Sequence, residues 1–170
     1  RVYRNNGDGT FEDVTGAAGV NVAFGNGLGV VGADFNDDGR IDVFVANDTM
    51  VNQLWINLGD LRFAEECMIW SCAMDSQGIE KAGMGVASAD VDDDGDSDLL
   101  VVNLELQSDS FFRNEGTYFF DATQQVGLGA TSMRHTRFGV VLGDFNNDGR
   151  LDLYEANGKV SSRGPTDGDE

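Results

Sequence analysis

The chain has 170 residues, and its 30 acidic residues against 11 Lys and Arg and one His give a formal net charge of −19. This balance argues against nucleic-acid binding and against a polybasic membrane anchor, because both need clustered positive charge. Hydrophobic residues make up 41% of the chain, enough for a buried core, yet no apolar run approaches the roughly 20 residues that cross a bilayer. Direct membrane insertion is therefore not expected.

The first predicted element is a hairpin at residues 3–11, and it recurs at 55–63 and 112–120. The three copies keep Asn, Gly and Phe at the same spacing, and aromatic and aliphatic residues flank the Gly-containing turn. Such turn chemistry between apolar residues predicts two antiparallel strands joined by a tight connection.

The second predicted element is a hairpin around an Asp-rich segment. Short runs of β-branched and small residues precede this segment at 28–33, 84–89 and 138–143, and a further apolar run follows it each time. This pattern predicts strands rather than helices. One face of the preceding strand carries mostly small residues, as expected where strands crowd close to a central axis: Gly29, Val31 and Ala33; Gly85, Ala87 and Ala89; Gly139, Val141 and Gly143.

The Asp-rich segments themselves share one template at residues 34–42, 90–98 and 144–152. Thirteen of the 30 acidic residues lie in these segments, so the negative charge is concentrated in the repeats. Two hairpins in each repeat of about 55 residues supply four antiparallel strands. The natural unit is a four-stranded propeller blade, and the fold class is all-β.

Blades cannot bury their faces alone, and radial arrays need about 4 to 8 of them to close. The chain has about three repeats, and it starts in one kind of hairpin and stops after the other kind. Either its two ends pair as one split blade, or both are edges of a longer array. We favour the longer array, which is consistent with a chain that begins at Arg1 without Met. The predicted organisation is a partial propeller over residues 1–160 and a polar tail over 161–170.

Each Asp-rich loop places oxygen side chains at positions 1, 3, 5 and 9 and Gly at position 6. Alternate positions of a sharp turn converge on one point, and a set of oxygen ligands with a further backbone carbonyl suits Ca²⁺ better than Mg²⁺. We therefore expect about three bound Ca²⁺ ions. The predicted ligands are Asp34, Asn36, Asp38, Arg40 and Asp42; Asp90, Asp92, Asp94, Asp96 and Asp98; and Asp144, Asn146, Asp148, Arg150 and Asp152, with Arg40, Asp96 and Arg150 offering backbone carbonyls.

The Asp-rich loops allow two other interpretations. Asp, Asn and Gly favour solvated turns without any metal, but three copies in phase argue against that view. A helix-loop-helix calcium site would close with a carboxylate at position 12, which only the third copy has, at Glu155. The corresponding residues in the other copies are Val45 and Val101, and strand-like sequences flank every loop. Glu155 then stands where its counterparts are apolar, as an edge residue or a local functional oddity.

The segment GLGVVGADFNDDG at 27–39, together with the Asn-Gly-Asp-Gly-Thr-Phe hairpin, resembles FG-GAP (VCBS-type) repeats. This family includes the propellers of integrin α-subunits and many secreted bacterial proteins. More narrowly, residues 3–20, 45–50 and 151–158 are similar to bacterial relatives of cartilage acidic protein. The resemblance implies a calcium-bound propeller of the seven-bladed type, used in extracellular binding or assembly. Two departures are Glu155 in place of an apolar residue and the presence of only three loops.

Weaker features lie in the connections between blades, which are expected to emerge on the face opposite the Asp-rich loops. Met68, Trp70, Met74, Met133 and Arg134 are candidate contact residues there, although Trp70 and the Met residues equally suit gaps between blades.

Cys67 and Cys72 form a local disulfide or remain two thiols, and the sequence does not decide between these. His135 is the only candidate general base, and a solvated loop histidine is the favoured interpretation.

The function predicted from the sequence is a calcium-binding, non-enzymatic propeller module at an extracellular, cell-surface or periplasmic location. It would bind a protein partner or additional propeller blades, as a subunit or fragment of a larger complex. One alternative is an FG-GAP-type lyase or hydrolase, but no carboxylate pair outside the repeats can be placed together from the sequence. Another is a carbohydrate-binding propeller, for which only Trp70 and Phe24 offer exposed aromatic side chains.

Overall fold

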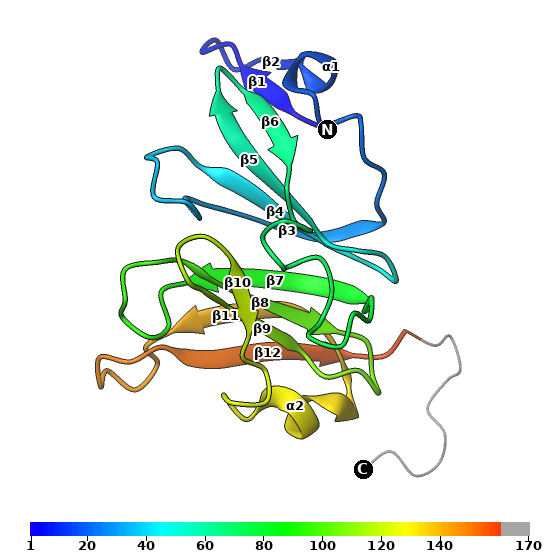
Figure 1. Ribbon diagram of the computed structural model, residues 1–170, viewed down its shortest axis with the longest axis vertical. Helices are drawn as coiled ribbons and strands as arrows, with labels where there is room; N and C mark the ends of the chain where they lie inside the picture. The colour runs from blue at the N-terminus through cyan, green and yellow to red at the C-terminus, as the bar shows by residue number, and fades with distance from the viewer. Residues whose placement is uncertain (161–170) are drawn as a thin grey trace.

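The computed structural model describes residues 1–160, and the predicted polar tail at 161–170 lies outside the described residues. The described chain forms strands β1 to β12 in four antiparallel sheets, with three short helical segments (Figure 1). The all-β class predicted from the sequence is therefore confirmed. None of the helices in the described region is long and apolar enough to span a bilayer.

Two of the sheets are complete four-stranded blades. The first has the order β3 (Gly27–Ala33), β4 (Asp42–Asn47), β5 (Gln53–Gly59) and β6 (Arg62–Glu65). The second has the order β7 (Gly83–Ala89), β8 (Asp98–Asn103), β9 (Ser110–Asn114) and β10 (Phe119–Asp121). Every neighbouring pair is antiparallel, as the two predicted hairpins per repeat require.

The two remaining sheets have two strands each. β1 (Tyr3–Asn5) pairs with β2 (Phe11–Asp13), and β11 (Thr136–Gly143) pairs with β12 (Asp152–Gly158). These half-blades lie at opposite ends of the stack (Figure 1), so the structure does not join them into one split blade. The connections between blades carry α1 (Thr15–Ala18), α2 (Leu128–Thr131) and η1 (Ser132–Arg134).

The first strands of successive blades pack side by side through glycines. A Cβ atom added to Gly29 would lie 3.0 Å from Cα of Gly85, and one added to Gly85 would lie 2.1 Å from the carbonyl oxygen of Phe138. No side chain fits at such separations, so β3, β7 and β11 approach closely only because these residues are small. This agrees with the small-residue face predicted near the axis.

The largest buried cluster fills the space between the two complete blades. Phe35 and Phe44 of the first blade meet Leu99, Phe112 and Phe119 of the second there. Fully burying each of these side chains contributes about 1.5–3 kcal/mol. A smaller cluster of Leu100, Phe111 and Ala122 packs against Val140, Leu142 and Leu153 of the last half-blade.

The connection from β6 to β7 supplies part of the same core. Cys67 and Cys72 form a disulfide with their Cα atoms 5.2 Å apart, which decides the question that the sequence left open. Trp70 lies between them in sequence, is 8% exposed, and accepts a hydrogen bond on its carbonyl oxygen from Phe119 N at 2.7 Å. Its ring lies 6.0 Å from that of Phe119, so Trp70 packs between blades and is not a surface contact residue.

Candidate metal centres

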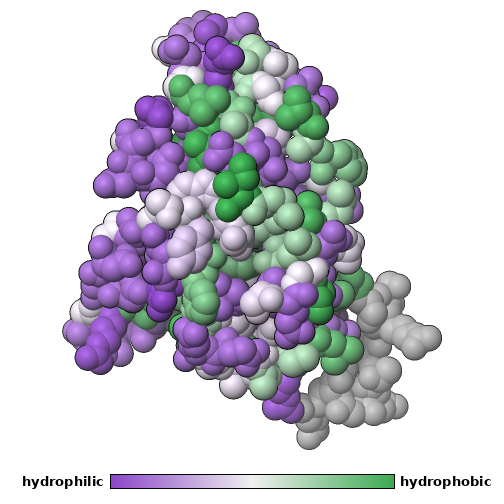
Figure 2. Space-filling model, in the orientation of Figure 1, coloured by the Kyte–Doolittle hydropathy of each residue, from purple (hydrophilic) through white to green (hydrophobic). Residues whose placement is uncertain are grey.

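The three Asp-rich loops connect the first and second strands of their sheets, β3 to β4, β7 to β8 and β11 to β12. Figure 1 shows all three at the left edge of the molecule, and Figure 2 shows hydrophilic residues covering that edge. The loops therefore form one acidic face, as the shared template predicted.

The backbone of each loop turns at positions 4 and 6. Position 4 has a left-handed conformation at Asp37, Asp93 and Asn147, with φ of 55°, 60° and 60°. Position 6 is Gly39, Gly95 and Gly149, with φ of 81°, 101° and 85°. Asp, Asn and Gly are the residues that tolerate this conformation, so the template sequence specifies the turn locally.

The first carboxylate of each loop closes the turn by accepting two backbone hydrogen bonds. Asp90 accepts from the N–H groups of Asp94 and Gly95 at 3.1 and 2.9 Å, and Asp144 accepts from Asp148 and Gly149 at 3.1 and 2.9 Å. Asp34 accepts from Asp38 and Gly39 at 3.2 and 2.7 Å. Each carboxylate is thus held in place inside the turn.

The second loop brings three carboxylates together. One oxygen each from Asp90, Asp92 and Asp94 lies within 4.8 Å of the other two. Arg113 reaches only the edge of this group, 3.9 Å from Asp92. Three negative charges at this separation repel one another, and a cation bound among them would remove that repulsion.

The first and third loops carry less charge at the same positions. Position 3 is Asn36 and Asn146, so an amide oxygen replaces a carboxylate there. In the first loop Arg40 also forms an ion pair with Asp38. A cation would meet a weaker negative field in both loops than in the second.

Position 9 has a different environment from positions 1, 3 and 5. Asp42 and Asp98 are 0% and 1% exposed. Asp42 accepts hydrogen bonds from Phe35 N at 3.1 Å and from Asn57 N at 2.7 Å, which ties the loop to β5. Asp98 accepts from Val91 N and from Asn114 N of β9 at 3.0 and 2.9 Å. In the first two loops the predicted closing ligand therefore also anchors the loop to the third strand of its blade, whereas Asp152 of the third loop accepts from Phe145 N of its own loop.

Burial and neighbouring carboxylates disfavour negative charge in the second loop. Burial raises the pKa of Asp98 to about 6, with further contributions from Asp92 and Asp94 and an opposing one from its backbone hydrogen bonds. The pKa of Asp96 is also raised, first by desolvation and then by Asp94 and by Asp37 of the first loop. A bound divalent cation would favour the ionised carboxylates and so lower their pKa values. The residues present therefore fit a Ca²⁺ ion.

A second group of charged residues, which sequence reasoning did not identify, lies between the second blade and the last half-blade. Arg137 Nε donates to Asp109 Oδ1 at 2.6 Å, with the two side chains 2% and 0% exposed. The carboxyl group of Glu155 lies close enough to Asp109 for each to shift the pKa of the other. The sequence alone could not place these two carboxyl groups together, because they lie far apart in the chain. The one signal in the sequence was Glu155, which is charged where its counterparts are Val.

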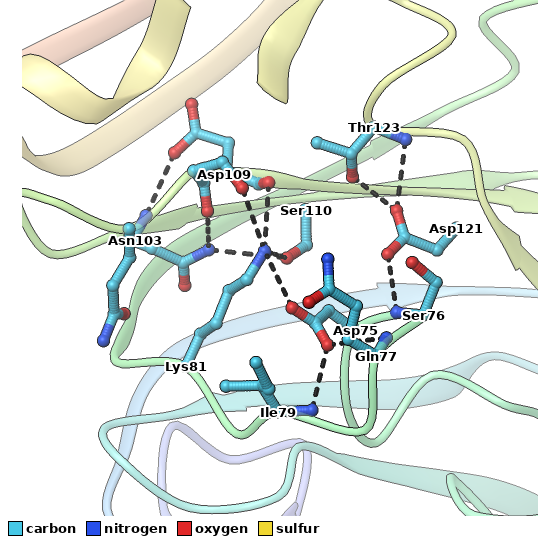
Figure 3. A network of polar contacts seen from close by, with 12 residues as sticks. Asp75, Ser76, Gln77, Ile79, Lys81, Asn103, Asp109, Ser110, Asp121 and Thr123 are labelled. Carbon is cyan, nitrogen blue, oxygen red and sulfur yellow. Dashed lines mark hydrogen bonds and ion pairs between the residues drawn. The ribbon is translucent and has the colours of Figure 1, made fainter. Parts of the chain in front are cut away.

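Asp109 belongs to a wider polar network, drawn in Figure 3. Lys81 Nζ donates to Ser108 and Ser110 at 3.1 Å and lies 3.7 Å from a carboxylate oxygen of Asp75. This network joins the β6 to β7 connection to the β8 to β9 connection, away from the Asp-rich loops.

The other predicted contact residues differ in exposure. Met68 and Met133 are 59% and 38% exposed, and Arg134 is also exposed, whereas Met74 packs partly against the main core. His135 is exposed on the connection before β11, as a solvated loop histidine would be. With Trp70 buried, Phe24, at 79% exposed, is the one remaining of the two aromatic side chains proposed for carbohydrate binding.

Four-stranded antiparallel blades, close-packed first strands and Asp-rich loops on one face define a protein built from propeller repeats. The FG-GAP-like repeat is matched at residues 1–45, 34–101 and 90–155, and the chain belongs to this family. Cartilage acidic protein 1 of Homo sapiens is 29% identical over 174 aligned residues, which cover 93% of this chain and 24% of that protein. The Xenopus tropicalis and Mus musculus proteins of the same name are each 28% identical, with 93% and 25% coverage. The chain thus spans about a quarter of the length of these relatives.

Proposed function

We propose that this chain is a calcium-binding propeller module that binds a protein partner or further blades in an extracellular, cell-surface or periplasmic setting. The proposal rests on the Asp-rich loop, whose sequence pattern and backbone conformation both occur three times in the chain. The cation would lie in the Asp-rich loops and stabilise the hairpins. The partner would bind to other surfaces, because the face that holds the structural ions serves as scaffold and binding residues are commonly carried by other loops.

The connections between blades are the proposed contact surface. They lie on the side away from the Asp-rich loops and carry exposed apolar side chains, which are common in protein interfaces. The exposed apolar residues on these connections are Val22, Phe24, Met68, Ile69, Ile79, Val126 and Met133.

The outer face of the last half-blade supports the idea of further blades. Tyr154 is 65% exposed, while its counterparts Phe44 and Leu100 are 0% and 1% exposed between blades. Phe145 is 56% exposed, and its counterpart Phe35 is 1% exposed. An apolar face of this kind is stable when another blade or a protein partner covers it.

The disulfide between Cys67 and Cys72 supports an oxidising location, because disulfides persist mainly outside the cytosol. Low Ca²⁺ affinity would also suit such a location, since extracellular sites bind at roughly 10⁻⁴ to 10⁻³ M. A binding module is favoured over the alternative of a lyase or hydrolase, because Asp109 of the carboxyl pair is fully buried and could not reach a substrate.

The test is a calorimetric titration of chelator-treated protein with Ca²⁺, with thermal melting recorded on the same samples. We expect about three ions per chain and a rise in melting temperature, because ions that bind only the folded chain stabilise it. Sedimentation of the same samples reports the oligomeric state. A folded chain that binds no Ca²⁺ would contradict the metal assignment.

A further inference from the structure

Glu155 is the one charged residue at its repeat position, and the structure places it in an interface between blades. It lies on β12, while Asp109 lies in the connection between β8 and β9 of the preceding blade. Arg137, on β11, forms the ion pair with Asp109. Three charged side chains therefore meet between the second blade and the last half-blade. In the other two repeats the position of Glu155 is occupied by an apolar residue, Val45 or Val101.

Arg137 satisfies only one of the two carboxyl groups. Its Nε donates to Asp109 Oδ1, and its two terminal nitrogens donate to the carbonyl oxygens of His135 and Gln107. Asp109 Oδ1 also accepts from Asn103 N at 3.1 Å. These bonds use one N–H of each guanidinium nitrogen and none of them goes to Glu155, so one positive charge offsets two carboxylates.

The two carboxyl groups each keep one buried oxygen without a donor. These are Asp109 Oδ2 and Glu155 Oε1. A buried acceptor without a donor costs about 1–3 kcal/mol. Two ionised carboxylates only accept hydrogen bonds, so they cannot satisfy each other, whereas one added proton turns the pair into a donor and an acceptor.

We propose that Asp109 and Glu155 form a proton-binding site that fastens the β11–β12 half-blade to the preceding blade. One proton from solvent binds to Glu155, which then donates to Asp109, and the charge of the pair falls from −2 to −1. With Arg137 the group becomes neutral. Loss of that proton leaves a net charge of −1 inside the interface and loosens the half-blade.

The charged groups around the pair are few among the described residues. Arg137 faces it from β11, and Lys81 Nζ lies 3.5 Å from the backbone carbonyl oxygen of Asp109. The short helical connection lines a pocket together with Leu153 and Glu155 of β12, and it contributes Leu128, Thr131 and Ser132, none of them titratable. Ser132 Oγ accepts from Asp109 N at 2.9 Å and so holds the Asp109 backbone.

The direction of the pH effect follows from the folded-state pKa. Burial raises the pKa of Glu155 from 4.5 to about 7, helped by its hydrogen bond to Asp109 and by the charge of Asp109, and opposed by Arg137. A carboxyl group with a raised folded pKa contributes its full stability below the unfolded value. That contribution is lost as the pH rises from 4.5 to about 7.

The test is Glu155→Gln in the full chain, unfolded by denaturant at several pH values with saturating Ca²⁺. Gln mimics the protonated side chain, because it is neutral and donates to Asp109. We expect the variant to match the parent near pH 4, below the unfolded pKa, and to exceed it near pH 8 by about tenfold or more in folding equilibrium constant. Glu105→Gln, an exposed change of the same charge in the β8 to β9 connection, should follow the parent at every pH.

A second measurement needs no variant. The carboxyl carbon of Glu155, followed by NMR in labelled parent protein, should titrate with a midpoint near 7. A midpoint near 4.5, the ordinary value, would overturn the proposal. Parallel stability curves for Glu155→Gln and the parent would overturn it as well, since a Glu that only fills space has no pH-dependent contribution.

Discussion

At the residue scale, the Asp-rich loop separates residues that shape the turn from residues that would hold a cation. Asp93 occupies the left-handed position 4, with φ of 60°, and is exposed. Asp94 is its direct neighbour, but it belongs to the group of three carboxylates with Asp90 and Asp92. Two adjacent Asp residues therefore have different roles, and their substitution offers a test at constant charge.

Asp94→Asn should weaken cation binding at the second loop by roughly tenfold or abolish it, because affinity at such sites depends on the number of charged ligands. Asp93→Asn removes the same charge from the same loop, and Asn tolerates the left-handed conformation. Calorimetry should therefore give one ion fewer, or one weaker site, for Asp94→Asn alone. Equal effects of the two substitutions would mean that only the overall field matters.

At the element scale, the approach of the first strands sets the geometry of the stack. Gly85 on β7 faces the carbonyl of Phe138 on β11, and the space for a side chain is absent. Gly139 occupies the equivalent position on β11, where a Cβ would lie 3.5 Å from Cβ of Ala156. The same residue type thus has a strict steric role at one position and ordinary packing at the other.

Gly85→Ala should destabilise the fold by about 1–3 kcal/mol or more, because a 2.1 Å contact with backbone forces β7 and β11 apart. Gly139→Ala should be neutral or slightly stabilising, since Ala restricts the unfolded chain more than Gly does. Denaturant unfolding of both variants gives the comparison. A similar loss for both would show that the close approach of β7 and β11 does not limit stability.

At the scale of the whole molecule, the net charge of −19 and its concentration in the loops make electrostatic repulsion a global property. The loops lie on one edge (Figure 2), so their charges add rather than cancel. Bound divalent cations would offset part of that charge. Removal of the cations should therefore make the stability of the chain more sensitive to salt.

In chelator, raising NaCl from about 0.01 to about 0.1 M should raise the melting temperature, because the screening length falls from about 30 to about 10 Å. The rise should be smaller in saturating Ca²⁺, where the ions already neutralise the loops. KCl at equal ionic strength serves as the control for specific Na⁺ effects. Identical salt dependence with and without Ca²⁺ would contradict cation binding in the loops.

The sequence by itself determined the local features of this protein. The strand positions, the two hairpins of each repeat and the turns at Gly39, Gly95 and Gly149 follow from apolar runs and turn chemistry within a few residues. The four-stranded blade then follows from the repeat length. The predicted ligands Asp90, Asp92 and Asp94 come together because they share one turn, and no distant contact is needed to place them.

Only the tertiary structure decided which distant residues meet. Trp70 packs on Phe119, and Asp98 is anchored by Asn114 of another strand. Arg137 and Glu155 meet Asp109 across an interface between sheets. These contacts depend on how blades stack, and a pattern within one segment carries no record of the separation between two segments. The sequence showed that Glu155 differs from its counterparts in the other repeats. Which residues it contacts was decided by the packing of one sheet on the next.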